Sequence, residues 1–185
     1  KIRSTESGDK TVFQNSNNKA FSKIIQEASA RYGVDEKIIS AVIKQESSFN
    51  PKAVSKCGDQ RLMQLMPATA NWVAKKLGMN DFRQYMLTDV STNLQLGAYY
   101  LNHVLVSLYD QPVLALAAYN AGPSRARRWR DTVNTLEGAI YAETIPFSET
   151  RDYVKKVMEN AMYYAKVLNP EQKSPTLKQR LGFIT

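Results

Sequence analysis

The sequence predicts an all-α, mostly helical fold with at most a short β-hairpin, because apolar residues recur at helical spacing along nearly the whole chain. No segment shows the strict alternation of apolar and polar residues that a half-buried strand requires. Residues typical of helix ends bracket the apolar stripes. With 185 residues, of which 43% are hydrophobic and 23% charged, we expect one globular domain with a sizeable core.

Six segments carry helical stripes with recognisable ends. Asp35 is a good N-cap for the second, and Pro67 stands where the first turn of a helix accepts proline. Gly33 and Gly78 directly follow two of the stripes, as C-terminal stops do. The segment 112–121 is apolar almost all round, which predicts a helix through the centre of the core. The expected helices span residues 21–32, 36–46, 67–77, 94–108, 112–121 and 148–165.

The remaining segments are expected to be loops or less regular structure. The helical period breaks over residues 48–65, where a loop or short hairpin is expected, and again over residues 131–146. Gly97 lies on the apolar stripe of the fourth expected helix, which indicates a close crossing with another helix. The expected organisation is a polar N-terminal arm at residues 1–18, one domain at 19–169, and a C-terminal tail at 170–185 packing on the surface.

Composition narrows the cellular setting. No stretch approaches the roughly 18 consecutive apolar residues of a membrane-spanning helix. Residues 1–18 lack the apolar core of a signal peptide. Because the chain begins with Lys1 rather than methionine, removal of a leader or of an upstream domain is compatible with the sequence.

The net charge of +8 predicts a basic surface suited to an anionic partner, such as nucleic acid, anionic lipid or a bacterial wall polymer. Cys57 is the single cysteine and His103 the single histidine, too few for a metal site and weak grounds for a nucleophilic pair. An arginine cluster around Trp129 is able to grip phosphates, but no helix-turn-helix pattern accompanies it, so no nucleic-acid partner is expected. The cluster comprises Arg125, Arg127, Arg128 and Arg130.

Glu46 is the candidate catalytic residue. It occupies the next inward position after Ile39, Val42 and Ile43, where the stripe predicts an apolar side chain. Burying a carboxylate there is unfavourable, and desolvation together with the helix C-terminus favours the neutral acid. A carboxyl group with a raised pKa is what a general acid near neutral pH needs. The alternative is an ordinary glutamate that points to solvent from a frayed last turn.

Four motifs add weight to this interpretation. They read AVIKQESSFNP at 41–51, LMQLMP at 62–67, AAYNAGP at 117–123 and ETIPFSETRDYV at 143–154. Together, over residues 21–168, they resemble the catalytic domain of the soluble lytic transglycosylases, which are related to goose-type lysozymes. The resemblance implies a lysozyme-like helical fold with a groove for a glycan strand.

Within this resemblance, Glu46 matches the family's catalytic acid/base, and Ser55 falls where a serine approaches the N-acetyl group of the substrate. Tyr119 and Asn120 match the tyrosine and asparagine beside the cleavage site. No cofactor or metal is implied. Seven positions match residues that contact the substrate in the family, namely Ser55, Gln64, Met66, Tyr119, Asn120, Glu143 and Tyr153.

One departure from the family pattern lies directly before the LMQLMP motif. The family has G-A-x-G there, whereas this chain has Asp59 in place of the alanine and Arg61 in place of the second glycine. If that position requires a positive φ, a bulky residue costs about 1–2 kcal/mol. If it lets the backbone approach the groove, Arg61 obstructs sugar binding. Arg61→Gly is therefore expected to raise stability, activity or both.

The family's reaction cleaves the bond between N-acetylmuramic acid (MurNAc) and N-acetylglucosamine (GlcNAc), with one glutamate acting as acid and then base and with a 1,6-anhydroMurNAc product. The motifs offer no obvious second carboxylate near Glu46, as a two-carboxylate glycosidase needs. The alternatives are a goose-type hydrolase and a catalytically weak peptidoglycan-binding module. The expected partner is the peptidoglycan strand, for a monomeric protein in the periplasm or outside the cell.

Overall fold

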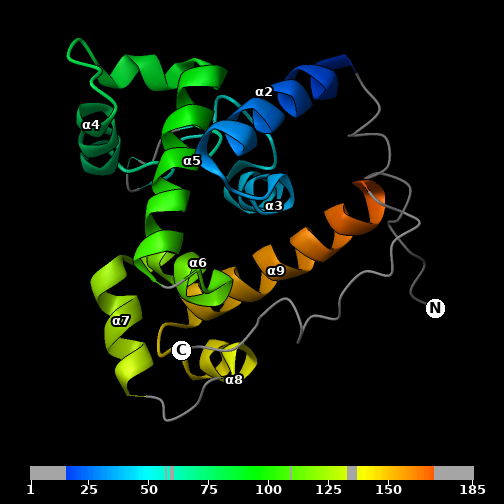
Figure 1. Ribbon diagram of the computed structural model, residues 1–185, viewed down its shortest axis with the longest axis vertical. Helices are drawn as coiled ribbons and strands as arrows, with labels where there is room; N and C mark the ends of the chain where they lie inside the picture. Colours follow the sequence, from blue (N-terminus) through cyan, green and yellow to red (C-terminus); the bar gives the residue numbers. More distant parts are fainter. Residues whose placement is uncertain (1–15, 57, 59–60, 109, 133–136, 169–185) are drawn as a thin grey trace.

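The fold consists of helices joined mostly by short connections, with one long connection between α3 and α4 (Figure 1). The structure, a computed structural model, describes residues 16–56, 58, 61–108, 110–132 and 137–168. Within these ranges there are eight α-helices, one 3₁₀ helix and no strand, which confirms the predicted all-α class. The helices are α2 (Ser16–Tyr32), α3 (Glu36–Ser47), α4 (Pro67–Lys76), η1 (Gln84–Thr88), α5 (Val90–Ser107), α6 (Pro112–Ala121), α7 (Pro123–Asp131), α8 (Gly138–Thr144) and α9 (Ser148–Leu168).

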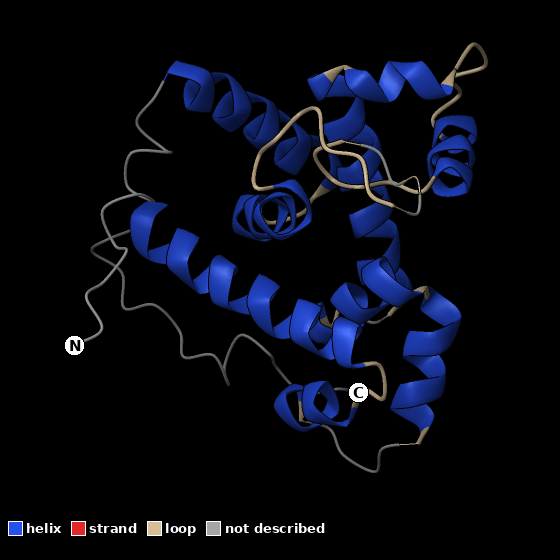
Figure 2. Ribbon diagram, turned by 180° about the vertical axis from the view of Figure 1, so that it is seen from behind, coloured by secondary structure: helices blue, strands red, loops and turns tan. Residues whose placement is uncertain are grey.

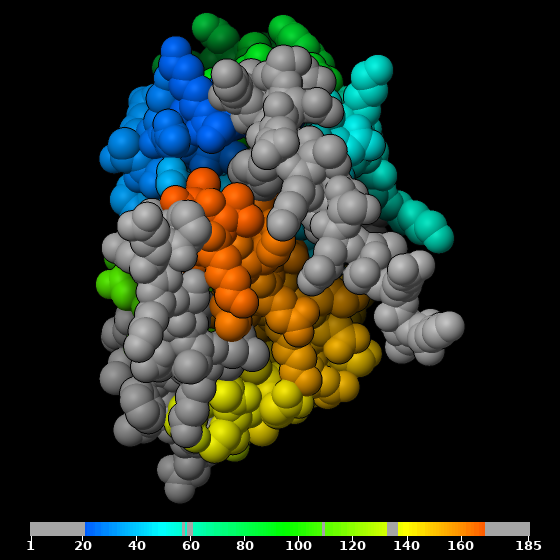
Figure 3. Space-filling model, turned by 90° about the vertical axis from the view of Figure 1, so that its right-hand side faces the viewer, coloured from blue at the N-terminus to red at the C-terminus, as the bar shows by residue number. Residues whose placement is uncertain are grey.

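The helices form two groups that meet at α6. In Figures 1 and 2, α2 to α5 occupy the upper part of the molecule, and α6 to α9 the lower part. Helix α3 of the upper group packs against α9 of the lower group, so segments far apart in sequence join the two groups, while α2 packs against α5 within the upper group. Figure 3 shows the right-hand side of the view in Figure 1, where α9 crosses the middle of the surface between α2 above and α8 below.

Helix α6 is the centre of the core, as its apolar composition predicted. All six residues from Val113 to Ala118 are buried, and α5, α7 and α9 pack around the helix. A second, smaller cluster lies under α4 and η1, around Leu87 and Leu96. Tyr100 and Tyr119 pack against both clusters and therefore link them. In the described part of the chain, no helix is both long and apolar enough to cross a membrane.

Two helices occupy segments that the sequence pattern left unassigned. The arginine-rich segment forms α7, in which Ala126 and Trp129 turn inward one turn apart. The stretch expected to be less regular contains α8, anchored by the buried Tyr141. With nine and seven residues these helices complete only about two turns, too few for the pattern to be recognised. Trp129 packs edge-on against Phe147 and is only 7% exposed, so its ring does not form a surface for stacking on bases.

The connection between α3 and α4 contains loop structure in its described residues. Val54 and Leu65 are isolated bridge positions rather than parts of strands. Cys57, Asp59 and Gln60 lie outside the described residues, as do most of the expected N-terminal arm and the whole expected C-terminal tail. The hairpin expected here is therefore absent from the described part of this connection.

Gly97 marks a close contact, but its neighbour is a loop side chain rather than the crossing helix that we expected. A Cβ atom added at Gly97 would lie 2.9 Å from Cβ of Met63 and closer still to its sulfur. Met63 is completely buried and precedes Gln64 in the LMQLMP motif. The missing side chain at Gly97 thus allows the loop that carries this motif to lie against α5.

Gly97→Ala should lower the free energy of unfolding by about 1–3 kcal/mol, because the added methyl group overpacks the contact with Met63. Chemical denaturation of Gly97→Ala, Met63→Ala and the double variant measures this coupling. The double variant should be more stable than the sum of the two single losses predicts, because Met63→Ala makes room for the methyl group. Strict additivity would show that the two residues do not interfere.

Candidate active site

Glu46 lies in the last turn of α3, where the chain reverses direction sharply. Ser48 caps the helix in the left-handed conformation, with φ of 50°, and Phe49 follows at 62°. Two successive non-glycine residues with positive φ are unfavourable and persist only when the surroundings hold them. Here Phe49 packs edge-on against Phe21 of α2 and Tyr164 of α9. This packing holds the chain reversal that follows Glu46.

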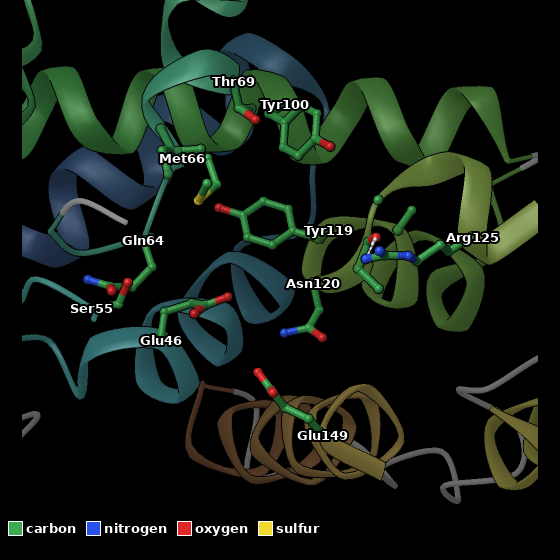
Figure 4. Close-up of a pocket in the computed structure, with 14 residues that line it drawn as sticks. Glu46, Ser55, Gln64, Met66, Thr69, Tyr100, Tyr119, Asn120, Arg125 and Glu149 are labelled. Atoms are coloured by element: carbon green, nitrogen blue, oxygen red, sulfur yellow. Dashed lines mark hydrogen bonds between the residues drawn. The ribbon is translucent and has the colours of Figure 1, made fainter. Parts of the chain in front are cut away.

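Glu46 borders a cleft with a volume of about 690 Å³ between the two groups of helices. Figure 4 shows Tyr119 in the middle of the cleft, with Glu46 and Gln64 to one side and Arg125 to the other. Six of the eight residues predicted from the sequence line this cleft. They are Glu46, Ser55, Gln64, Met66, Tyr119 and Asn120.

The LMQLMP segment is tied to three helices beside Glu46. The Ser47 hydroxyl, next to Glu46 on α3, donates a hydrogen bond to the Leu62 carbonyl at 2.8 Å. At Met63, the backbone N–H donates to Oδ1 of the buried Asn93 on α5 at 3.1 Å. The Met63 carbonyl accepts a bond from the Tyr119 hydroxyl on α6 at 2.8 Å. These bonds set the position of Gln64 and Met66 relative to Glu46.

Arg61 has a φ of 64°, so this position does adopt the positive φ that glycine accommodates best. This agrees with the first explanation for the glycine in the family pattern. Its guanidinium group donates from Nη1 to the Lys52 carbonyl at 3.2 Å, and its backbone N–H donates to the Ala53 carbonyl at 2.7 Å. Arg61 lies outside the cleft lining, whereas Gln64, also at positive φ, lies within it. The arginine therefore braces the loop and does not obstruct the cleft, contrary to the second expectation.

Tyr153 is buried beside Glu46 instead of lining the cleft, and its side chain is 6% exposed. Burial raises the pKa of its hydroxyl well above the usual value, and the charge of Glu46, the Tyr119 hydroxyl and a hydrogen bond to Glu46 raise it further. The hydroxyl has no hydrogen-bond partner other than Glu46 among the described residues. Tyr153 therefore remains a protonated donor next to the carboxyl group.

Asn120 is oriented from behind by Thr150 of α9, whose buried hydroxyl donates to the amide oxygen at 2.7 Å. The amide nitrogen is thereby turned toward Glu46, as Figure 4 shows. From the same helix, Glu149 points into the cleft below Asn120. A donor amide and a second carboxylate thus face the space in front of Glu46.

Glu143 lies outside the cleft, where it forms a 2.6 Å ion pair with Lys155 and is 63% exposed. Conversely, the predicted set of site residues missed four polar or charged residues in the lining, namely Thr69, Tyr100, Arg125 and Glu149. Glu149 lies in the ETIPFSETRDYV motif, which therefore could have indicated it as a site residue. The sequence prediction chose Glu143 from the same motif instead. Thr69 and Tyr100 carried no comparable signal, because both lie on helices with ordinary patterns.

Residues 23–142 match the model of the transglycosylase SLT domain. The chain belongs to this family. Residues 144–173 match the model of the soluble lytic transglycosylase helical domain. The family resemblance of the four sequence motifs is thereby confirmed.

Individual relatives agree with this membership. The soluble lytic murein transglycosylase of Salmonella typhimurium is 38% identical over 133 residues, which are 71% of this chain and 21% of the relative. The 70 kDa soluble lytic transglycosylase of Escherichia coli superposes with a TM-score of 0.82 at 31% identity, over 89% of this chain and 27% of that chain. An inactive glutamate-to-glutamine mutant of lytic transglycosylase Slt from Pseudomonas aeruginosa has a TM-score of 0.79 at 35% identity. The match covers 88% of this chain and 26% of that chain. The chain thus spans about a quarter of these relatives' lengths.

The conformation of Arg61 predicts an order of stability among substitutions. Arg61→Ala loses the guanidinium bond to Lys52 but keeps the unfavourable positive φ, whereas Arg61→Gly loses the bond and relieves the backbone. Arg61→Gly should therefore be about 1 kcal/mol more stable than Arg61→Ala in urea unfolding. Equal stability of the two variants would show that the left-handed conformation is not strained here.

The position of Tyr153 predicts a shift in the pH dependence of activity. A donor beside Glu46 stabilises its carboxylate form, so Tyr153→Phe should raise the pKa of Glu46. A reaction that needs protonated Glu46 would then persist to higher pH, and the alkaline limb of the rate profile should move upward. Profiles of wild type and Tyr153→Phe on purified peptidoglycan measure this, with thermal unfolding as the control for folding. An alkaline limb that stays in place or moves downward contradicts this role.

Proposed function

We propose that this chain cleaves the β-1,4 bond between MurNAc and GlcNAc in peptidoglycan by lytic transglycosylation, with Glu46 as the single acid/base. The observation that carries the proposal is the placement of Glu46 at the border of a 690 Å³ cleft, beside the buried donor Tyr153 and opposite the oriented amide of Asn120. Membership of the family and the names of the relatives support the same reaction.

In the proposed reaction, protonated Glu46 donates its proton to the glycosidic oxygen while the bond to C1 of MurNAc breaks. The carbonyl oxygen of the substrate's own N-acetyl group stabilises the positive charge at C1. Glu46, now a carboxylate, removes the proton from the C6 hydroxyl, whose oxygen attacks C1. The product is 1,6-anhydroMurNAc, no water is consumed, and Glu46 returns to its acid form.

The surrounding residues have roles that follow from their contacts. The Tyr119 hydroxyl is held by the Met63 carbonyl, so its ring has a set position against the sugar. The side-chain nitrogen of Gln64 donates to the carbonyls of Ala53 and Arg61, which fixes this amide at the cleft wall. Ser55 lines the cleft beside Gln64 in Figure 4, and we assign it the contact with the N-acetyl group of the substrate.

A goose-type hydrolase is the second candidate, and Glu149 is the observation that favours it. A two-carboxylate hydrolase uses one carboxyl group as acid and a second as base or nucleophile across the scissile bond. Glu149 faces the cleft from α9, opposite the helix that carries Glu46. In that mechanism Glu149 would activate a water molecule, and the product would carry a reducing end.

The proposed setting is the bacterial cell envelope, with the chain acting as a monomer on glycan strands in the periplasm or outside the cell. The basic character of the chain suits this substrate, because peptidoglycan carries carboxylate groups. Arg127 and Arg128 on α7 are exposed, whereas Arg130 forms a 3.0 Å ion pair with Asp131. Only part of the arginine cluster is therefore available to attract the polymer.

Glu46→Gln should lower turnover on purified peptidoglycan by at least about 10²–10⁴-fold, the contribution of a general acid, and should leave thermal unfolding nearly unchanged. Glu143→Gln, outside the cleft, is the matched control and should retain activity. Under the single-glutamate mechanism, Glu149→Gln should lose far less activity than Glu46→Gln, whereas a hydrolase with Glu149 as base loses comparable activity in both. Near wild-type turnover by Glu46→Gln would refute the assignment.

Mass spectrometry of the released fragments separates the two reactions directly. Anhydro ends and reducing ends differ by the mass of one water molecule. Fragments that lack this water support transglycosylation, and reducing ends support hydrolysis. Binding to peptidoglycan without release of any fragment would contradict both reactions and support the alternative of a catalytically weak peptidoglycan-binding module.

A further inference from the structure

A continuous series of aromatic rings leads from the cleft to the molecular surface. It begins at Tyr119 in the cleft, whose ring centroid lies 5.5 Å from that of Tyr100. Tyr100 stacks on His103 with an interplanar angle of 21° and a separation of 6.4 Å. His103 in turn contacts Trp72 of α4 at 4.7 Å. The rings therefore connect α6, α5 and α4 across the cleft's edge.

The two outer rings differ from the two inner ones in their exposure. Tyr100 and Tyr119 are partly buried against both hydrophobic clusters, so packing accounts for them. His103 is exposed, and Trp72 is 37% exposed. Leaving an indole in contact with water forgoes the stabilisation that burial of a large aromatic side chain provides. Core packing therefore does not account for this outer pair.

We propose that Trp72 and His103 form an outer sugar-binding platform, which extends the cleft beyond Tyr100 and stacks on a sugar ring of a long glycan strand. The proposal rests on the function proposed above, because it takes the glycan in the cleft as the ligand that continues onto these rings. Aromatic faces suit the apolar faces of pyranose rings, and Thr69, one turn before Trp72 on α4, lines the cleft and provides the continuity.

The charges around the platform favour an acidic glycan. The Lys76 ammonium lies 5.6 Å from the centroid of the Trp72 ring. Burial lowers the pKa of His103, and the positive charges of Lys76 and Arg127 lower it further, so the imidazole is neutral near pH 7. The ring is thus uncharged while two cations lie close enough to affect its pKa, and these cations would attract the free lactyl carboxylates of MurNAc in a peptide-free strand.

The first experiment compares affinities for a long and a short ligand, namely peptide-free glycan strands and a tetrasaccharide of alternating GlcNAc and MurNAc. All variants carry Glu46→Gln so that the ligands are not consumed. Trp72→Ala and His103→Ala should weaken binding of the long strands by roughly tenfold, and by more than they weaken binding of the tetrasaccharide. Trp72→Phe keeps a ring against His103, so its affinity for the long strands should lie between that of Trp72→Ala and that of the parent protein, which carries Glu46→Gln alone.

Tyr85→Ala is the matched control, because Tyr85 is 70% exposed on η1 and lies outside both the ring series and the cleft lining. This variant should bind both ligands like the parent. Thermal unfolding of every variant identifies any loss of folding. If Trp72→Ala binds long strands with unchanged affinity, or if Tyr85→Ala weakens binding equally, the platform is refuted.

The second experiment measures the tryptophan fluorescence of protein in which both tryptophans are retained. The chain contains two tryptophans, of which Trp129 is 7% exposed and Trp72 is 37% exposed. Acrylamide therefore quenches mainly Trp72, and long strands should protect it more than the tetrasaccharide does. Strands that bind without protecting Trp72 would refute the platform.

Together with the mass spectrometry of fragments released by wild-type protein, these two experiments distinguish failure of the platform from failure of the proposed reaction. If wild-type protein releases anhydro fragments while Trp72→Ala binds strands normally, the reaction stands and the platform fails. If strands bind through Trp72 but wild-type protein releases no fragments, the platform stands and the reaction fails. If wild-type protein neither binds nor cleaves strands, both proposals fail.

Discussion

The backbone of Met63 is held from two sides, and the geometry of the cleft depends on this arrangement. Asn93 of α5 accepts its N–H, and Tyr119 of α6 donates to its carbonyl. Both groups are shielded from water, so an unsatisfied partner would cost about 1–3 kcal/mol. Gly97 makes the approach possible by leaving room for the Met63 side chain. One short segment of chain thereby sets the distance between three helices.

Unfavourable backbone conformations concentrate around the same segment. Ser48, Phe49, Arg61 and Gln64 all have positive φ, and they lie at the two ends of the connection that follows Glu46. Such conformations persist when the surrounding contacts over-determine them. Ser47 bonds to Leu62, Phe49 packs between two helices, and the Arg61 guanidinium bonds to the Lys52 carbonyl. Stability elsewhere in the fold therefore sustains the arrangement of residues that face the cleft.

The cleft combines groups whose ionisation and orientation are controlled by different neighbours. Glu46 lies beside a buried phenol whose pKa is raised mainly by burial, so that the phenol stays a donor. Asn120 is turned by Thr150, and Tyr119 by Met63. Neither Thr150 nor Met63 lines the cleft. The residues that face the substrate are therefore held by a second set of residues that belongs to the core.

The sequence by itself determined the all-α class, the central position of α6, and the placement of Glu46 where an apolar stripe meets a loop. These follow from local periodicity, because a helix presents residues three and four apart on one face. Tertiary structure alone decided that Glu149 rather than Glu143 faces the cleft, that Tyr153 lies buried beside Glu46, and that Trp72 meets His103 at the surface. These placements depend on how α3, α4, α5, α8 and α9 pack, and helix packing brings together residues whose spacing in the sequence carries no local pattern.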